Sequence, residues 1–260
     1  MREREPGQEA LVKSFEGFLM KHFRVDEPEI LHKAELKSLH NILGLLKQKY
    51  LEGKNLFSDE ELQKMFDEFG PGISVVNNPF TQKDNFSHLL KAGVQNRRTL
   101  SIGCGIAPYE VFLASQGIIR EEIVALDFTQ SILDGGRMLA ANAGVTNIRF
   151  KNANGTQLDY HEEFGQVWLI DSLSWIPHWR ECLRRTTKTV ECDGTLLISY
   201  QKDFGVATVK EVEVADIILK SGLDLTTLYH FNETDEFPRT FIAAKRVEAR
   251  PDQLLVVSSF

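Results

Sequence analysis

The chain has 260 residues, of which 42% are hydrophobic and 26% charged, and its formal net charge at pH 7 is -7. This size suffices for one well-buried core and a small additional subdomain, and the composition is typical of a soluble globular protein. The acidic balance argues against a broad nucleic-acid surface, and no apolar run reaches the roughly 20 residues that cross a bilayer. We therefore expect a cytoplasmic protein that contacts neither nucleic acid nor membrane.

The cysteines and the first residues restrict the class further. Cys104, Cys182 and Cys192 include no C-x-x-C pair, which fits a reducing compartment with no disulfide framework. The histidines show no metal-ligand spacing, so no metal site is expected. Residues 1–6 are not followed by an apolar run, so we expect no signal peptide.

Residues 8–70 are predicted to be helical. Apolar side chains recur at helical spacing over residues 11–23 and 36–50. Ser58 and Glu61 form a capping box for a third helix. These patterns indicate that helices precede any sheet in this chain.

Two shorter segments follow these helices. Residues 73–84, with Asn77-Asn78-Pro79-Phe80 in the middle, are predicted to be a loop, and residues 86–90 a short helix. We assign residues 1–95 to an N-terminal helical subdomain and residues 96–260 to the main domain. The subdomain either packs on the sheet for stability or forms a lid that shapes a substrate pocket, and both interpretations remain open.

A glycine turn follows the first predicted strand. Leu100–Ile102 reads as a short buried strand, after which Gly103 and Gly105 allow a tight turn with no Cβ facing a ligand. Pro108 then suits the first turn of a helix. A strand, a glycine turn and a helix N-terminus in this order are typical of a nucleotide-type crevice at the carboxyl end of a parallel strand.

The remaining sequence alternates predicted strands with helices. The expected strands are residues 123–126, 147–150, 167–170, 195–200, 223–231 and 239–246. The helix over residues 179–190 is expected to have Gly194 as its C-cap, and another helix covers residues 206–221. This alternation predicts an α/β fold with a doubly wound, Rossmann-like sheet that is mostly parallel and has one antiparallel edge strand.

Asp127 ends the second predicted strand. A carboxylate at this position can accept both hydroxyls of a ribose, as in dinucleotide-binding folds. The alternative interpretation is a strand-end residue that caps the next helix. Pro108 occupies the third-glycine position of the dinucleotide pattern G-x-G-x-x-G, so the sequence argues against a nicotinamide-dependent dehydrogenase.

Five segments together resemble the class I S-adenosylmethionine-dependent methyltransferases, in their small-molecule branch. They are Leu100–Gly105, Ala125–Leu133, Asn147–Thr156, Val167–Pro177 and Cys192–Ser199. The first is similar to the family's motif for the methionine part of the cofactor, and the second to the motif whose acid binds the ribose. The resemblance implies S-adenosylmethionine as cofactor, S-adenosylhomocysteine as product and no metal.

The resemblance also implies a set of cofactor-binding residues. They are Gly103, Cys104, Gly105, Asp127, Phe128, Thr129, Asn154, Gly155, Asp171 and Ser172. Two positions depart from the family's pattern: Ser101 stands where an acidic residue is usual, and Asn154 where an aspartate usually binds the adenine amino group. The Asn154 side-chain oxygen can still accept that hydrogen bond. Phe128 can stack under adenine or pack in the core.

The substrate pocket is predicted to be aromatic. Its expected lining is Tyr109, Trp175, Trp179 and Tyr200. An aromatic wall near the transferred methyl group would attract a sulfonium or a cationic product, although Trp179 suits core packing equally well. His178 is a candidate general base, a role that lone histidines usually lack, and Cys104 is expected to pack rather than react.

The resulting hypothesis is methyl transfer from S-adenosylmethionine to a small-molecule acceptor by in-line displacement. This chemistry needs the nucleophile and the methyl group in register and water excluded, so no catalytic constellation has to be visible in the sequence. Two alternatives remain: methylation of a macromolecule, protein or RNA, and a regulatory module that binds the cofactor without transferring a methyl group. The identity of the acceptor and the choice between monomer and homodimer stay open.

Overall fold

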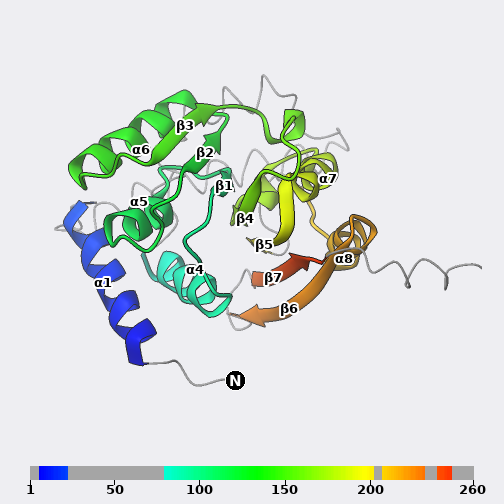
Figure 1. Ribbon diagram of the computed structural model, residues 1–260, viewed down its shortest axis with the longest axis horizontal. Helices are drawn as coiled ribbons and strands as arrows, with labels where there is room; N and C mark the ends of the chain where they lie inside the picture. The colour runs from blue at the N-terminus through cyan, green and yellow to red at the C-terminus, as the bar shows by residue number, and fades with distance from the viewer. Residues whose placement is uncertain (1–5, 23–78, 202–206, 232–238, 248–260) are drawn as a thin grey trace, which may run out of the picture.

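The computed structural model describes residues 6–22, 79–201, 207–231 and 239–247. In this part of the chain, one seven-stranded sheet in the order β3-β2-β1-β4-β5-β7-β6 has helices on both faces (Figure 1). The helices predicted over residues 36–50 and 58–69, and residues 73–78 of the predicted loop, lie outside the described residues.

The elements follow the alternation that the sequence predicts. The strands are β1 (Thr99–Ile102), β2 (Ile123–Asp127), β3 (Ile148–Asn152), β4 (Phe164–Ile170), β5 (Val190–Gln201), β6 (Leu223–Phe231) and β7 (Arg239–Arg246). The α-helices are α1 (Pro6–His22), α4 (Pro79–Lys91), α5 (Pro108–Ser115), α6 (Gln130–Asn142), α7 (Trp179–Thr189) and α8 (Glu211–Lys220). Two 3₁₀-helices, η1 (Gly155–Gln157) and η2 (Leu173–Trp175), follow β3 and β4.

Strands β1 to β5 are parallel, and β7 runs antiparallel to both β5 and β6. The prediction of a mostly parallel Rossmann-like sheet with an antiparallel strand at one edge is therefore confirmed. The antiparallel strand is β7, one position inside the edge, and β6 is outermost. Side-chain burial explains this order, because Phe241–Ala244 of β7 is buried whereas β6 carries the exposed Leu228 and polar residues that suit an edge.

Two local predictions are wrong. Gly194 is not the C-cap of α7, which ends at Thr189, but lies inside β5. A Cβ at this position would lie 2.8 Å from the Glu191 carbonyl oxygen and 3.0 Å from that of Phe164, so a glycine permits the irregular pairing of β4 and β5 there. Pro79, expected in a loop, begins α4 because its fixed φ suits a first helical turn.

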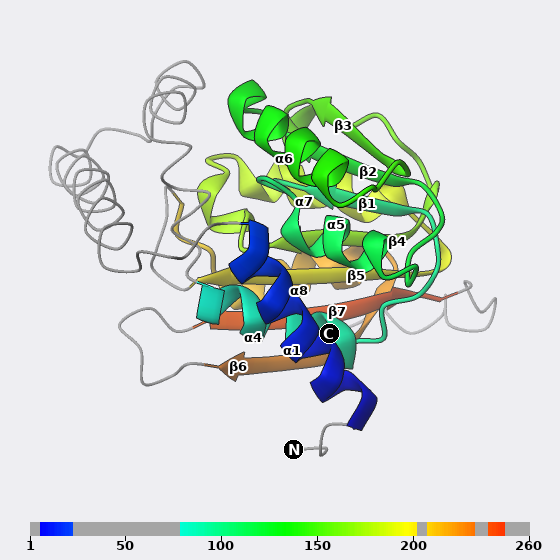
Figure 2. The ribbon, with the colours of Figure 1, turned by 90° about the vertical axis from the view of Figure 1, so that its left-hand side faces the viewer.

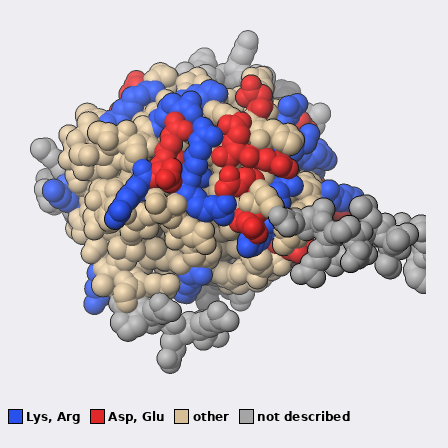
Figure 3. Space-filling model, in the orientation of Figure 1, with Lys and Arg blue, Asp and Glu red and all other residues tan. Residues whose placement is uncertain are grey.

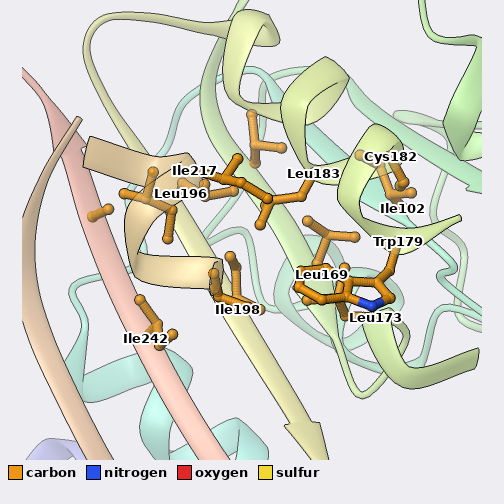
Figure 4. Packing of buried hydrophobic residues seen from close by; sticks show 14 of the residues in the cluster. Ile102, Leu169, Leu173, Trp179, Cys182, Leu183, Leu196, Ile198, Ile217 and Ile242 are labelled. Carbon is orange, nitrogen blue, oxygen red and sulfur yellow. The ribbon is translucent and has the colours of Figure 1, made fainter. Parts of the chain in front are cut away.

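Helices α7 and α8 cover one face of the sheet. Ile102, Leu169 and Ile198 point from the strands into a buried layer, where they meet Trp179 and Leu183 of α7 (Figure 4). The layer extends to the carboxyl end of β1 through Ile102. Through this layer, α7 packs against the end of β1 that leads into the glycine turn.

Helices α1, α4, α5 and α6 lie over the other face (Figure 2). Phe15 of α1 is fully buried, with its ring centroid 4.3 Å from that of Phe86 in α4 and 5.2 Å from that of Phe112 in α5. These rings join Trp168 and Phe241 of the sheet in one cluster, and each such buried side chain stabilises the fold by about 2–3 kcal/mol. Helices α1 and α4 thus share a core with the sheet, while the domain boundary near residue 95 and the lid stay predictions.

Surface charges of both signs lie side by side. Basic and acidic side chains alternate on the face seen in Figure 3. Arg98 bonds to Glu122 at 3.0 Å and to Glu163 at 3.1 Å, and Arg149 bonds to Glu122 at 2.9 Å. Exposed pairs of this kind contribute at most about 1 kcal/mol each.

Among the described helices, none is both long and apolar enough to span a membrane.

Candidate active site

The turn after β1 depends on left-handed backbone conformations. Gly103 and Gly105 have φ angles of 65° and 57°, and Ala107 has a φ of 55° just before α5 begins at Pro108. A Cβ on Gly103 would lie 2.5 Å from the Cβ of Ser172, so only glycine allows the ends of β1 and β4 to approach this closely. Nothing described lies within 4 Å of the position of a Cβ on Gly105, which leaves the turn's backbone open.

Asp127 is oriented by the backbone of two neighbouring loops. Its Oδ2 accepts a hydrogen bond from the Gly105 N–H at 3.1 Å, and its Oδ1 accepts one from the Thr129 N–H at 3.0 Å. Burial raises the pKa of this carboxyl, and hydrogen bonds from the backbone N–H groups of Thr129, Gly105 and Phe128 oppose that shift. A carboxylate can accept about four hydrogen bonds, so it can still take one from a ligand hydroxyl.

The loop after β3 is tied to the end of β2. The Asn152 amide donates to the Phe128 carbonyl at 2.7 Å, and the Ala153 N–H donates to the Asp127 carbonyl at 3.0 Å. Asn154 caps η1, because its Oδ1 accepts hydrogen bonds from both the N–H and the hydroxyl of Thr156 at 2.9 Å. The amide nitrogen of Asn154 is therefore the part of its side chain that remains to contact a ligand.

A cavity of about 260 Å³ lies at this edge of the sheet. Its lining comes from the ends of β1, β2 and β3 and the segment after β4, and consists of Ile102, Gly103, Asp127, Phe128, Asn152, Ala153, Asn154, Gly155, Thr156, Trp175, Ile176, Pro177 and His178. Of the residues predicted for the cofactor, Gly103, Asp127, Phe128, Asn154 and Gly155 are thus brought together around one space. The structure adds Trp175 and His178, which were predicted for the acceptor.

Three other predicted cofactor residues lie beside the cavity. The Cys104 N–H donates to the Leu126 carbonyl at 2.9 Å, which joins the glycine turn to β2. Burial, then the nearby Asp127, raises the pKa of the Cys104 thiol well above its usual value, so the thiol is not a nucleophile at neutral pH. Thr129 is fully buried behind Asp127, and Ser172 packs on Gly103.

Asp171 faces away from this cavity into a buried polar cluster. It has a φ of 52° at the end of β4, and its carboxylate accepts hydrogen bonds from the Asn85 amide at 2.6 Å and the Ser199 hydroxyl at 3.1 Å. The Arg239 Nε lies 3.6 Å from the same carboxylate. We call Asn85, Asp171, Ser199 and Arg239 the edge cluster; all four are buried.

The edge cluster leaves polar atoms without partners. Among the described residues, neither the Asn85 Oδ1 nor the Arg239 Nε has a hydrogen-bond partner. Tyr109 adjoins the cluster: burial, then Asp171, raises the pKa of its hydroxyl well above the usual value, and Asn85 opposes the shift. Buried polar atoms of this kind need an explanation, because leaving one unpaired costs about 1–3 kcal/mol.

Two of the predicted pocket aromatics are core residues. Trp179 is 1% exposed and packs beside Leu169 and Leu173 (Figure 4), and the Arg180 guanidinium lies over its ring, 4.5 Å from the centroid. Tyr200 is also 1% exposed. These positions favour core packing for both, whereas Trp175 lines the cavity. No group of three or more His, Cys, Asp or Glu side chains among the described residues could hold a metal ion.

Comparison with known proteins gives the class. Residues 100–198 match the family model described as "Methyltransferase domain". The demethylmenaquinone methyltransferase of Listeria monocytogenes serotype 4a (strain HCC23) is 21% identical over 144 residues. That match covers 53% of this chain and 61% of the length of the relative.

Solved structures show the same fold. The [4+2]-cyclase SpnF is 11% identical, with a TM-score of 0.63 over 73% of this chain and 96% of that one. The geranyl diphosphate C-methyltransferase from Streptomyces coelicolor A3(2), solved with Mg²⁺, geranyl diphosphate and S-adenosyl-L-homocysteine, is 11% identical, with a TM-score of 0.56 over 67% of this chain and 82% of that one. Identities this low establish the architecture and say nothing of the reaction.

The resemblance read from the sequence is therefore confirmed. Residues 100–198 match the methyltransferase-domain family, and the sheet order with β7 between β5 and β6 gives the chain a Rossmann-like architecture. Both findings agree with the resemblance to the class I, S-adenosylmethionine-dependent methyltransferases.

Proposed function

We propose that the protein transfers the methyl group of S-adenosylmethionine to a small-molecule acceptor. The observation that carries this proposal is the cavity of about 260 Å³ with the Asp127 carboxylate and the backbone of Gly103 on its wall. A nucleoside needs a hydroxyl acceptor and a flat apolar surface, and Asp127 with Phe128 offers both. The open backbone at Gly105 leaves room for the amino-acid end of the cofactor.

The adenine contact is proposed in a revised form. The Asn154 Oδ1 already accepts two hydrogen bonds from Thr156, so it is poorly suited to accept a third from the adenine amino group. The Asn154 amide nitrogen can instead donate to a ring nitrogen of adenine. Asp127 accepts the ribose hydroxyls, and Gly103 allows the backbone to lie against the ligand.

When bound, S-adenosylmethionine would supply an activated methyl carbon: the acceptor's lone pair would form the new bond to this carbon from the side opposite sulfur, and the electron pair of the broken carbon–sulfur bond would stay on sulfur. The chain's own residues hold the acceptor in line and exclude water. His178 and Trp175 line the cavity at its other wall and are proposed to face the reacting atoms. A general base is required only if the acceptor arrives protonated.

A small acceptor is favoured over a macromolecule by the size of the cavity, about 260 Å³, whose walls come from the ends of β1, β2 and β3 and the segment after β4. The names of one relative and of one solved structure with the same fold, which contain demethylmenaquinone and geranyl diphosphate, also point to small acceptors.

Titration calorimetry followed by label transfer tests the proposal. S-adenosylmethionine and S-adenosylhomocysteine are expected to bind the full chain, and Asp127→Asn serves as the weakened control. Methyl-labelled cofactor is then incubated with three fractions of a cell extract: small metabolites, RNA and protein. Label in the metabolite fraction supports the proposal, and label only in RNA or protein overturns the acceptor class. Binding without transfer would make the domain a cofactor-binding module, and no binding at millimolar cofactor would end the proposal.

A further inference from the structure

The exposed hydrophobic side chains are concentrated at one end of the sheet. Among the described residues, six large hydrophobic side chains are exposed, and four of them lie on α8, on β6 or directly after β7. These four are Val212, Leu219, Leu228 and Val247. We call them, together with the outer side of β6, the β6 surface. Single exposed hydrophobic residues are normal, but a group of them in one place marks an interaction surface.

Leu219 and Val247 lie near the start of β6. Leu223, the first residue of β6, pairs with Arg246 of β7, and Val247 follows Arg246 directly. The Arg246 guanidinium also donates to the Ser221 carbonyl at 3.4 Å. Ser221 caps α8 two residues after Leu219, so the ends of α8 and β7 meet at this corner of the sheet.

Val212 and Leu228 lie further along the same strand. The His230 Nε2 is 3.4 Å from the Glu211 carboxylate, so α8 begins beside the end of β6, and Val212 is the second residue of α8. Leu228 pairs with Ile242, whose side chain points into the layer under α7 and α8. Leu228 is therefore on the same face of the sheet as α8.

The backbone of β6 is available along the same surface. It is the outermost strand (Figures 1 and 2), and among the described strands only β7 pairs with it. Its sequence, Leu223–Phe231, includes no Lys, Arg or Pro, the residues that commonly protect an edge strand from pairing with another chain. A bulge between Leu225 and Thr227 limits a regular ladder to the residues on either side of it.

A second copy of the same strand complements this surface. A two-fold axis perpendicular to the sheet makes the strand run antiparallel to its own copy, so that backbone donors meet acceptors. Leu228 then lies near Leu228 of the other copy, and Val212 lies toward Leu219 of the other copy. Asp224 and His230 stand near opposite ends of β6, so the Asp224 end of each copy meets the His230 end of the other and like charges stay apart.

The size of the surface fits a dimer of moderate affinity. The nine residues of β6 span about 30 Å, and a sheet layer with a helix on it is about 20 Å thick. Each copy would therefore bury about 600 Å², or about 1,200 Å² in total, which is the lower limit for stable interfaces. We expect a dissociation constant on the order of 10 μM.

We propose that the β6 surface binds a second copy of this chain, with the two β6 strands antiparallel and the two α8 helices on one face of a joint sheet. The cavity lies at the ends of β1, β2 and β3, and β4, β5 and β7 separate these strands from β6. Pairing through β6 leaves both cavities open. The inference therefore goes beyond the proposed function and does not depend on it.

Sedimentation velocity of the full chain without ligand, from about 1 to 200 μM, tests the oligomeric state. A monomer–dimer equilibrium is expected. Leu228→Lys puts two like charges near the two-fold axis and should weaken the dimer at least about 30-fold. Leu228 is 40% exposed, so the variant is expected to fold, which urea denaturation checks. Met138→Lys, at an exposed hydrophobic position in α6, is the matched control and should leave the dissociation constant unchanged.

Hydrogen exchange of the β6 amides separates strand pairing from association elsewhere. In the unmodified chain we expect slower exchange over Leu223–Phe231 at high protein concentration than at low concentration. This measurement tests the proposal whether or not Leu228→Lys folds. A chain that stays monomeric over the whole range, a dimer that a folded Leu228→Lys leaves intact, or a dimer whose β6 amides exchange as fast as those of the monomer overturns the proposal.

Discussion

The two halves of the sheet's carboxyl edge are built in different ways. Around the ends of β1, β2 and β3, the polar contacts are mostly between a side chain and a backbone group, as Asp127 makes with the N–H groups of Gly105 and Thr129 and Asn154 with that of Thr156. Around the ends of β4, β5 and β7, the edge cluster joins side chains from separate elements, with Asn85 and Asp171 86 residues apart. The first half is a frame made by the main chain, and the second is a set of side chains held by packing.

This difference separates contacts that the backbone of the fold provides from contacts that depend on the side chains of the individual protein. A backbone frame recognises the constant part of a ligand, because N–H groups and glycine conformations do not vary with side-chain identity. A side-chain cluster can change without loss of the fold.

The largest expected effect tests the rigidity of the frame. Gly103→Ala combines a φ of 65° with a Cβ 2.5 Å from that of Ser172. Left-handed strain of about 1–2 kcal/mol and overpacking of about 1–3 kcal/mol should together lower the free energy of unfolding by about 4 kcal/mol. Urea denaturation measures the loss, and calorimetry should show more than 100-fold weaker S-adenosylhomocysteine binding as the turn shifts.

Gly144→Ala is the control for this substitution. Gly144 has a φ of 69° with nothing described within 4 Å of its Cβ position. Gly144→Ala therefore has the strain of the left-handed conformation without any overpacking. We expect a loss of about 1 kcal/mol and unchanged ligand binding. Equal losses in the two variants would mean that the contact between β1 and β4 is not what makes the frame rigid.

The second prediction concerns Glu110, an acid in the first turn of α5 that is 2% exposed. Burial raises the folded-state pKa of Glu110 from 4.5 to about 7, so the folded state holds its proton more tightly than the unfolded state. The stability of the unmodified chain relative to Glu110→Gln should therefore fall as pH rises from about 4.5 to 7 and level off above 7. The shift corresponds to about 3 kcal/mol, with the glutamine variant the more stable at pH 8 and the two similar near pH 4.5.

Urea denaturation of both proteins between pH 5 and pH 8, without ligand, measures this difference. Glu121→Gln supplies the control at each pH. A constant difference across the range would show that the Glu110 carboxyl has its ordinary affinity for protons in the folded chain.

The third prediction tests whether the two halves are independent. Asn85→Ala removes the amide that donates to the Asp171 carboxylate at 2.6 Å, and a hydrogen bond to a buried charge contributes about 2 kcal/mol. We expect that loss in urea denaturation, with S-adenosylhomocysteine affinity within about twofold of the unmodified chain. Asn147→Ala, which loses amide bonds to the Ile119 and Glu121 carbonyls, is the comparison outside the edge cluster. A large change in cofactor affinity with Asn85→Ala would show that the halves are coupled.

Much of the frame could be predicted from the sequence because its signals are local. The glycine turn, the acid at Asp127 and the bounds of β6 and β7 all follow from patterns within a few residues. The edge cluster gives no such signal, because Asn85 and Arg239 meet only through the sheet order. Glu110 was missed for a related reason: a glutamate in a first helical turn reads as exposed, and only packing against β1 buries it.

The smallest expected effect concerns Asp127, for which the sequence left two roles. If Asp127 binds the ribose, Asp127→Asn removes the charge from a hydroxyl contact. The binding of S-adenosylhomocysteine and of 5′-methylthioadenosine should then weaken equally, by about 10-fold. If Asp127 instead caps the helix by accepting a hydrogen bond from the Thr129 N–H at 3.0 Å, the same variant would lower the free energy of unfolding by about 1 kcal/mol and leave both affinities unchanged. Calorimetry with the two ligands and urea denaturation separate these outcomes. Asp134→Asn, at an exposed position in α6, is the control for lost charge.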